Sequence, residues 1–186
     1  MYALRCCPAS YGILCREEYD PVKHQGETVI LDQYDGKRWA EHQIHWILRQ
    51  VRVPFPSFEC SDNFAQGQVV RADTGARYTY EFKIPMGKEM EPWSTRIITS
   101  SKPANQLPQS MKRGDARELC VVETTLHPYD LKRKNRHWYN TGQEYNRAEF
   151  EVRVIVGAGL RFEIWSKDGI RKSRDHEEID VQWQSA

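Results

Sequence analysis

The C-terminal part of the chain alternates apolar and polar residues with a period of two, and no other feature restricts the fold more strongly. Residues 147–156 read RAEFEVRVIV, in which one face is apolar and consists of Phe150, Val152, Val154 and Val156. Gly157 and Gly159 follow, and glycine adopts the positive φ angles of tight turns at little cost. Residues 160–165 (LRFEIW) then repeat the alternation. Because successive strand side chains point to opposite faces, the pattern predicts an antiparallel hairpin with one buried face.

Similar runs occur at 77–84 (RYTYEFKI), 95–101 (TRIITSS), 118–126 (ELCVVETTL) and 177–183 (EEIDVQW). Short strands separated by turn-rich segments predict a mostly β protein, an antiparallel β-sandwich with at most one or two short helices. A chain of 186 residues is long enough for one domain with a substantial core. We therefore expect a single domain over residues 1–186, with long loops or insertions at about 20–38, 65–93, 101–115 and 127–146.

Residues 35–50 (DGKRWAEHQIHWILRQ) fit a helix or a strand. Ile44, Trp46 and Leu48 would share one face of a strand. His42 and His45 would share a face, and conceivably a metal ion, only in a helix, because an odd separation places two strand residues on opposite faces. Periodicity alone leaves both alternatives open.

The motifs of common catalytic and metal sites are absent from the sequence. There is no HExxH, no GxSxG and no phosphate-binding GxxxxGK[ST]. The five cysteines include no CxxC pair, so free thiols in a reducing compartment are the preferred interpretation over a disulfide framework or a zinc site. The alternative is a soft-metal site formed by Cys6, Cys7 and Cys15. We expect no catalytic residue, no metal and no cofactor; an enzyme would require convergence of histidines with an acid, the histidines being His42, His45, His127 and His137.

Charge gives little indication of a partner. The formal net charge is +1, which favours neither nucleic acid nor an anionic membrane. A basic cluster, Lys132, Arg133, Lys134 and Arg136, stands beside Trp138, and we interpret it as a solvated loop. No apolar run approaches the roughly 18 residues of a membrane span, and the N-terminus lacks the apolar run of a signal peptide. We expect a cytoplasmic protein that binds no nucleic acid and no membrane.

Several segments occur in a characteristic order: ASYGILCREEYDPVKH, YDGKRWAEHQIHWILRQ, PFPSFECSDNF, TRIITSSKP, ELCVVETTL and EFEVRVIVGAGLRFEIWSKDG. Over most of residues 9–169 this order resembles the C-terminal region of divergent heat-shock-70-like proteins that carry an actin-like ATPase domain. The resemblance implies a β-sandwich similar to the substrate-binding part of those chaperones. It also implies that the partner is an extended peptide or a protein, and that an actin-like ATPase domain is a further candidate partner.

The resemblance further assigns individual strands. The first would hold residues 10–13, the second 44–48, the third would begin at Phe58, and the fourth would contain Ile97 and Ile98, with the hairpin at 148–166 completing the sheets. Residues 37–41 would be a turn or a short helical piece. The candidate peptide-binding residues by position are Ile44, Trp46, Phe58, Ile97 and Ile98.

The chain departs from the family pattern in three respects. The phosphate-binding glycine motifs of the ATPase domain are missing from the sequence, we expect no helical lid after Trp183, and residues 20–35 and 66–93 are long insertions that would border the peptide groove. We therefore expect a non-enzymatic peptide- or protein-binding module. The alternative is a truncated structural or regulatory fragment that acts by docking on an ATPase domain or by dimerisation.

Overall fold

The structure is a computed structural model and describes residues 5–6, 9–50, 76–174, 179–180 and 184–185. Its described part consists of antiparallel sheets, which confirms the predicted mostly β sandwich. Helical geometry is limited there to two short 3₁₀ turns, η1 (Ala104–Gln106) and η2 (Pro128–Asp130). Accordingly, no helix among these residues is long and apolar enough to cross a membrane.

One layer of the sandwich is a five-stranded sheet with the order β3-β4-β2-β6-β7. Its strands in chain order are β2 (Ser10–Glu18), β3 (Val29–Leu31), β4 (Arg38–Leu48), β6 (Trp93–Ser100) and β7 (Arg117–Thr124). The predicted first, second and fourth strands thus lie side by side at the centre of this sheet. The predicted third strand, with Phe58, lies outside the described residues.

The second layer is a four-stranded sheet built around β9. One edge of β9 pairs with β5 along its length, and its other edge pairs with β10 and β8 in succession. The bounds of these strands are β5 (Ala76–Pro85), β8 (Leu131–Lys134), β9 (Tyr145–Val156) and β10 (Leu160–Ser166). A short separate pair joins β1 (Arg5–Cys6) to β11 (Gln184–Ser185).

The C-terminal hairpin has the predicted form. Alternate residues of β9 are buried along its whole length, and Phe150, Val152 and Val154 are almost completely enclosed. Leu160 and Phe162 of β10 add to the same core. The five-stranded sheet contributes the facing part of this core, mainly Tyr11, Ile13, Ile47, Leu48, Ile97 and Val122.

Residues 38–48 form one strand, which confirms the strand interpretation of the 35–50 segment and corrects the turn or helical piece expected at 37–41. The chain reverses earlier, where Gly36 adopts a φ of 69°. Arg38, Trp39 and Ala40 then pair with β3, a strand of three residues that local periodicity does not reveal. Pairing on this edge extends β4 by several residues toward its N-terminus.

The long ranges expected to be loops also contain strands. Range 20–38 includes β3, range 65–93 includes β5, and range 127–146 includes β8. The alternation at 77–84 already predicted β5. In contrast, β8 is the polar sequence LKRK, which becomes a strand because its backbone pairs with residues 145–148 of β9.

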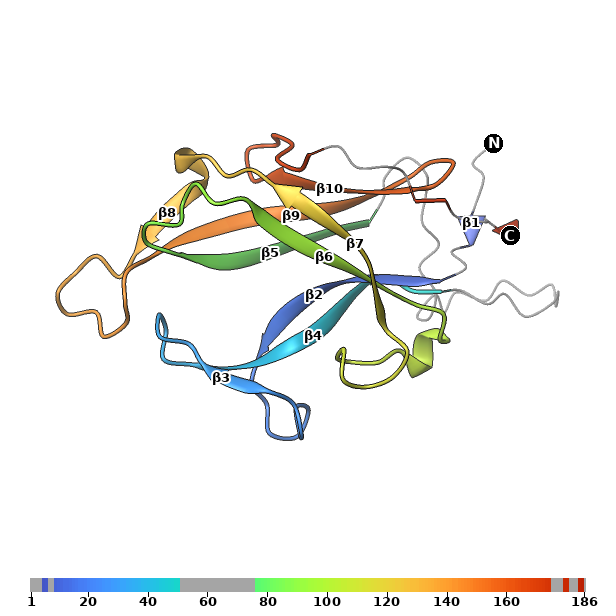
Figure 1. Cartoon of the computed structure of the whole chain (residues 1–186), viewed down its shortest axis with the longest axis horizontal. Coiled ribbons are helices and arrows are strands. Elements are labelled where there is room, and N and C mark those ends of the chain that lie inside the picture. The colour runs from blue at the N-terminus through green and yellow to red at the C-terminus, as the bar shows by residue number, and fades with distance from the viewer. Residues whose placement is uncertain (1–4, 7–8, 51–75, 175–178, 181–183, 186) are drawn as a thin grey trace, which may run out of the picture.

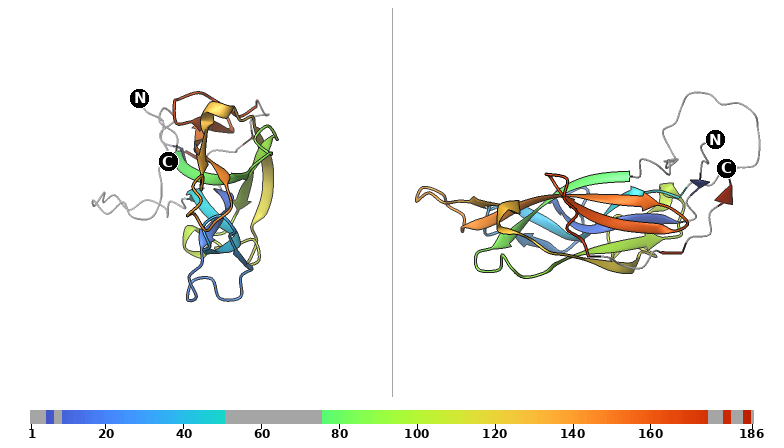
Figure 2. Two further views of the ribbon diagram at one scale, coloured as in Figure 1. Left: turned by 90° about the vertical axis from the view of Figure 1, so that its left-hand side faces the viewer. Right: turned by 90° about the horizontal axis from the view of Figure 1, so that it is seen from above.

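The two layers are not equally close along their length. In Figure 1 they diverge toward the end that carries β3 and β8, and the loop between β8 and β9 extends beyond both. The view from above in Figure 2 shows the same loop at one tip of an elongated molecule. The core residues of β9 and β10 lie away from that tip, so the layers separate where the core ends.

Candidate binding cleft between the sheets

Three of the predicted groove residues share the outer face of the five-stranded sheet. Gly12 of β2 pairs with Trp46 on one side and with Ile98 on the other, and Leu14 pairs with Ile44. Ile97, the next residue, faces the other way and belongs to the core between the sheets. The structure therefore brings Ile44, Trp46 and Ile98 together and separates Ile97 from them.

This outer face is not an open groove, because another part of the chain runs along β4. The backbone N–H of Ile44 donates to the carbonyl of Gln109 at 2.8 Å, and the indole N–H of Trp46 donates to the carbonyl of Pro108 at 2.8 Å. Ile44 and Ile98 are buried, and Trp46 is partly buried. The predicted residues form a packed face and expose little surface to a peptide.

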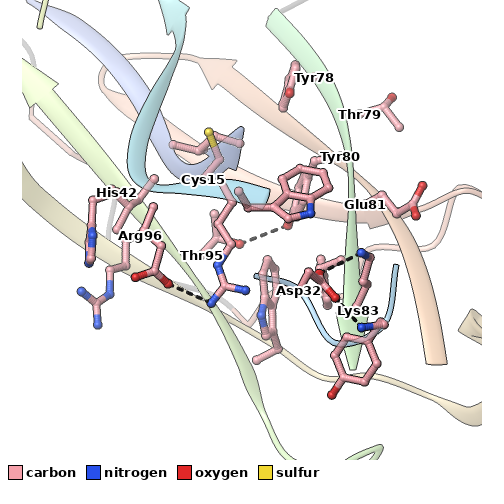
Figure 3. A pocket seen from close by; sticks show the side chains of 18 residues that line it. Cys15, Asp32, His42, Tyr78, Thr79, Tyr80, Glu81, Lys83, Thr95 and Arg96 are labelled. Atoms are coloured by element: carbon pink, nitrogen blue, oxygen red, sulfur yellow. Dashed lines mark hydrogen bonds and ion pairs between the residues drawn. The ribbon is translucent and has the colours of Figure 1, made fainter. Parts of the chain in front are cut away.

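An open cleft of about 680 Å³ lies instead between the two sheets. Side chains from β2, β4, β5 and β6 and from the β3–β4 turn line it, and Figure 3 shows Cys15, Tyr80 and Lys83 around the same space. Its volume falls within the range of pockets that hold small ligands or a few side chains.

An aromatic row lines one wall of the cleft. Alternate residues of β5, namely Tyr78, Tyr80 and Phe82, point inward, and each is only partly buried. Phe82 stacks on Trp93 of β6 with ring centroids 3.6 Å apart, and the hydroxyl of Tyr80 lies 3.1 Å from that of Thr95. The row therefore presents a preformed apolar surface with fixed ring positions.

Two partly buried ionisable groups, His45 and Cys15, lie beside the aromatic row. The ring of His45 stacks on that of Tyr78 at 3.7 Å, and burial lowers the pKa of His45. Burial, with a contribution from Glu17, raises the pKa of the Cys15 thiol to about 12. A thiol that stays protonated is a poor nucleophile, so Cys15 and His45 do not form an activated pair.

At one end of the cleft, ionic contacts connect β5 to the β3–β4 turn. Nζ of Lys83 on β5 lies 2.8 Å from a carboxylate oxygen of Asp32 and 2.5 Å from one of Asp35, both in the β3–β4 turn. It also lies 5.2 Å from the ring centre of Trp39. Partial burial opposes the charge on Lys83, but the hydrogen bonds to the two carboxylates raise its pKa overall. These contacts join the two sheets.

One edge of β5 has no strand partner within the described residues, since β5 pairs only with β9. Six consecutive residues, 78–83, line the cleft. The backbone edge as well as the aromatic face therefore borders the open space. The outward side chains Arg77, Thr79 and Glu81 are exposed, as is common on the edge strands of soluble proteins.

The four histidines singled out from the sequence have separate surroundings. His42 is exposed in a bulge of β4, with a φ of 58°, and His45 faces Tyr78. His127 and His137 stack on tyrosines two positions further along the chain. In the part of the chain that the structure describes, no group of three His, Cys, Asp or Glu side chains is arranged to hold a metal ion.

The amino-acid sequence does not predict the cleft, although its aromatic residues are a visible signal. The alternation of Tyr78, Tyr80 and Phe82 predicts a strand. Three aromatic residues at alternate positions, with Trp93 after the next turn, provide more ring surface than a short core strand requires. The residues that these rings contact belong mainly to the other sheet, so they depend on how the two sheets pack.

Comparison with known families gives one match. A family model described as a domain of unknown function (DUF8568) matches residues 5–185. No curated protein and no solved structure matches the chain. Because the family model spans nearly the whole chain, the protein belongs to the DUF8568 family.

Proposed function

We propose that this protein is a non-enzymatic module that binds an extended peptide or a segment of another protein in the cleft between its sheets. The observation that carries the proposal is the coincidence of two features on β5. Its backbone edge has no strand partner among the described residues, and its inward aromatic row borders the same open space.

Such a strand binds peptides by strand addition. Backbone groups of the edge hydrogen-bond to the peptide, and alternate peptide side chains point toward one side. Those side chains would enter the cleft and contact Tyr78, Tyr80 and Phe82. Because the rings are already stacked, binding costs little side-chain entropy, which favours affinity.

The resemblance to the substrate-binding region of heat-shock-70-like proteins supports the same function. It rests on the order of short motifs, and peptide binding is the activity that the order implies. Within this proposal the protein is cytoplasmic, and an actin-like ATPase domain is a possible further partner. We place the proposed binding site in the cleft, and not at the residues that the resemblance had indicated by position.

The alternative proposal, docking or dimerisation, is favoured by the same free edge. β5 of one copy can pair with β5 of a second copy in an antiparallel manner, which would also satisfy the edge. Light scattering coupled to size exclusion separates the two proposals. A monomer over the accessible concentration range supports peptide binding, whereas a dimer that Thr79→Pro disrupts supports self-association.

The test of peptide binding uses fluorescence anisotropy with labelled heptapeptides in which aromatic or aliphatic residues alternate with serine. We expect dissociation constants of roughly micromolar order. The matched control is the same peptide with alternate backbone nitrogens methylated, which keeps every side chain and removes the hydrogen-bond donors. We expect the methylated peptide to bind at least about tenfold more weakly, since several backbone bonds are lost.

A protein variant tests the cleft itself. Tyr78→Ala should weaken peptide binding about tenfold, because one aromatic contact of the row is lost. The control variant, Trp138→Ala, changes an exposed ring on the β8–β9 loop and should leave peptide affinity unchanged. Affinities no tighter than about millimolar for the whole panel would contradict the function. Equal binding of methylated and unmethylated peptides would contradict strand addition.

A further inference from the structure

The loop between β8 and β9 exposes aromatic residues at one tip of the molecule. Trp138 is 95% exposed and Tyr139 is 64% exposed. Their rings contact each other edge to face, and His137 stacks on Tyr139. Figure 1 shows this loop projecting past both sheets. A tryptophan exposed to this degree is unusual in a soluble protein, because leaving its large apolar surface in water is unfavourable.

Unpaired positive charge accompanies these rings. Residues 131–145 contain four basic residues and one acidic residue, Glu144. Arg133 forms an ion pair with Glu144, whereas Lys132, Lys134 and Arg136 form none among the described residues. The net charge of +1 conceals this concentration, because most other cations of the described chain stand beside a carboxylate.

The loop is held in place by the neighbouring turn between β3 and β4. The side-chain amide of Asn135 donates to the carbonyl of Tyr34 at 2.8 Å, and the backbone N–H of Gln143 donates to the carbonyl of Gln33 at 3.1 Å. At Gly142, a Cβ atom would lie 2.0 Å from the carbonyl oxygen of Tyr34, so the two segments pack closely. Contacts with the β3–β4 turn therefore hold the β8–β9 loop, and with it the aromatic residues at its tip, in a defined position.

We propose that this tip, defined by Lys132, Lys134, Arg136, Trp138 and Tyr139, binds the surface of membranes that contain anionic phospholipids. Tryptophan and tyrosine partition into the headgroup region, where the ring is in an apolar medium and its polar atom is hydrated. The cations lie close to the rings in the sequence and are attracted to lipid phosphates, which strengthens binding about fivefold for each Lys or Arg near the surface. Together the two contributions supply reversible binding without a spanning helix.

The shape of the tip favours a membrane over single-stranded nucleic acid, which also combines cations with aromatic rings. Nucleic-acid strands lie in a positively charged groove that follows their backbone. Here the rings and cations stand on a projecting hairpin, which suits a flat surface. A net charge of +1 does not oppose this binding, because the local charge distribution determines attraction over the Debye length of about 10 Å.

The experiment measures sedimentation of the full chain with vesicles. One set is pure phosphatidylcholine, and the other contains about one-third phosphatidylserine, which supplies the negative surface potential. We expect binding to the anionic vesicles, weak binding to the neutral ones, and release at high salt. Tryptophan emission should shift to the blue on binding, and the shift should be absent in Trp138→Ala.

Two variants test the two contributions. Changing Lys132, Lys134 and Arg136 together to glutamine should lower the partition coefficient on the order of a hundredfold, since each charge contributes about fivefold. Trp138→Ala should lower it about tenfold. The control is Val22→Ala, which alters a residue that is 90% exposed on the β2–β3 loop and should not affect partitioning.

Three outcomes would overturn the inference. These are no sedimentation of the wild-type protein with anionic vesicles, equal binding to both vesicle types, or an unchanged partition coefficient in both tip variants. Tight binding of an oligothymidine without vesicle binding would assign the tip to nucleic acid instead. Tyr78→Ala should bind vesicles like the wild type, so failure of the peptide proposal and failure of the membrane proposal are distinguishable.

Discussion

At the scale of single residues, His45 illustrates how a strand position determines chemistry. Its imidazole stacks on Tyr78 and is therefore partly removed from water. Desolvation disfavours the charged form, and the neighbouring Arg49 and Lys23 act in the same direction, whereas Glu17 opposes them. The pKa of His45 is lower in the folded protein than in the unfolded chain.

This lowered pKa predicts a pH dependence of stability. Below the ordinary pKa of about 6.5, the unfolded chain binds a proton at His45 that the folded protein resists. The free energy of unfolding should therefore fall as the pH decreases through this region toward the folded-state pKa. His45→Phe keeps an aromatic ring against Tyr78 and should lose less stability over the same interval. Urea unfolding of both proteins at about pH 7.5 and about pH 5.5 measures the difference. Equal losses would show that His45 does not titrate differently on folding.

At the scale of elements, β4 is interrupted by two irregularities in its pairing with β2. One lies between the pairs Cys15–Gln43 and Glu17–Ala40, and the other between Tyr11–Leu48 and Gly12–Trp46. An extra residue in one strand transfers the following side chains to the other face. Ile47 and Leu48 consequently both belong to the core, although they are consecutive.

The backbones of β2 and β4 approach each other closely at Gly12. A Cβ atom there would lie 2.6 Å from the carbonyl oxygen of His45 and 3.0 Å from Cγ2 of Ile44. Because the closer atom is backbone, Gly12→Ala should separate the strands and lower the free energy of unfolding by about 1–3 kcal/mol. Thr79→Ala, an exposed change on β5, is the control and should stay within about 0.5 kcal/mol. Denaturant titration of both variants gives the comparison, and a neutral Gly12→Ala would mean that β4 moves freely at this point.

At the scale of the whole molecule, two different interactions join the sheets. Apolar packing between β2, β6, β9 and β10 forms the core, whereas the cleft end depends on the contacts of Lys83 with the β3–β4 turn. The side chains of Lys83 and Asp32 are 17% and 10% exposed, so these charges are largely desolvated. Partly buried ion pairs of this kind are costly to disrupt from one side, because the remaining charge stays buried.

Lys83→Met should therefore lower the free energy of unfolding by about 1–3 kcal/mol, since Asp32 and Asp35 lose their cation. The matched control is Lys37→Met. Lys37 pairs with Glu18 at 2.8 Å, but both side chains are more than half exposed, and exposed pairs of this kind contribute little to stability. Thermal unfolding of the two variants tests the prediction. Equal effects would indicate that the cleft end is held by packing alone.

Strands whose side chains alternate between apolar and polar were predictable from the amino-acid sequence, because alternation is a local property. The β9–β10 hairpin, the strand at 93–100 and the aromatic strand at 76–85 follow from it, whereas the strand that begins at Ser10 was expected only from the family resemblance. The tertiary structure decided which faces meet. Bulges in β4 shift side chains between faces, the chain at 108–111 runs along β4, and Lys83 finds its carboxylates about fifty positions away. The cleft arises from these non-local contacts, so its aromatic residues could be predicted to lie in a strand but not to face an open space.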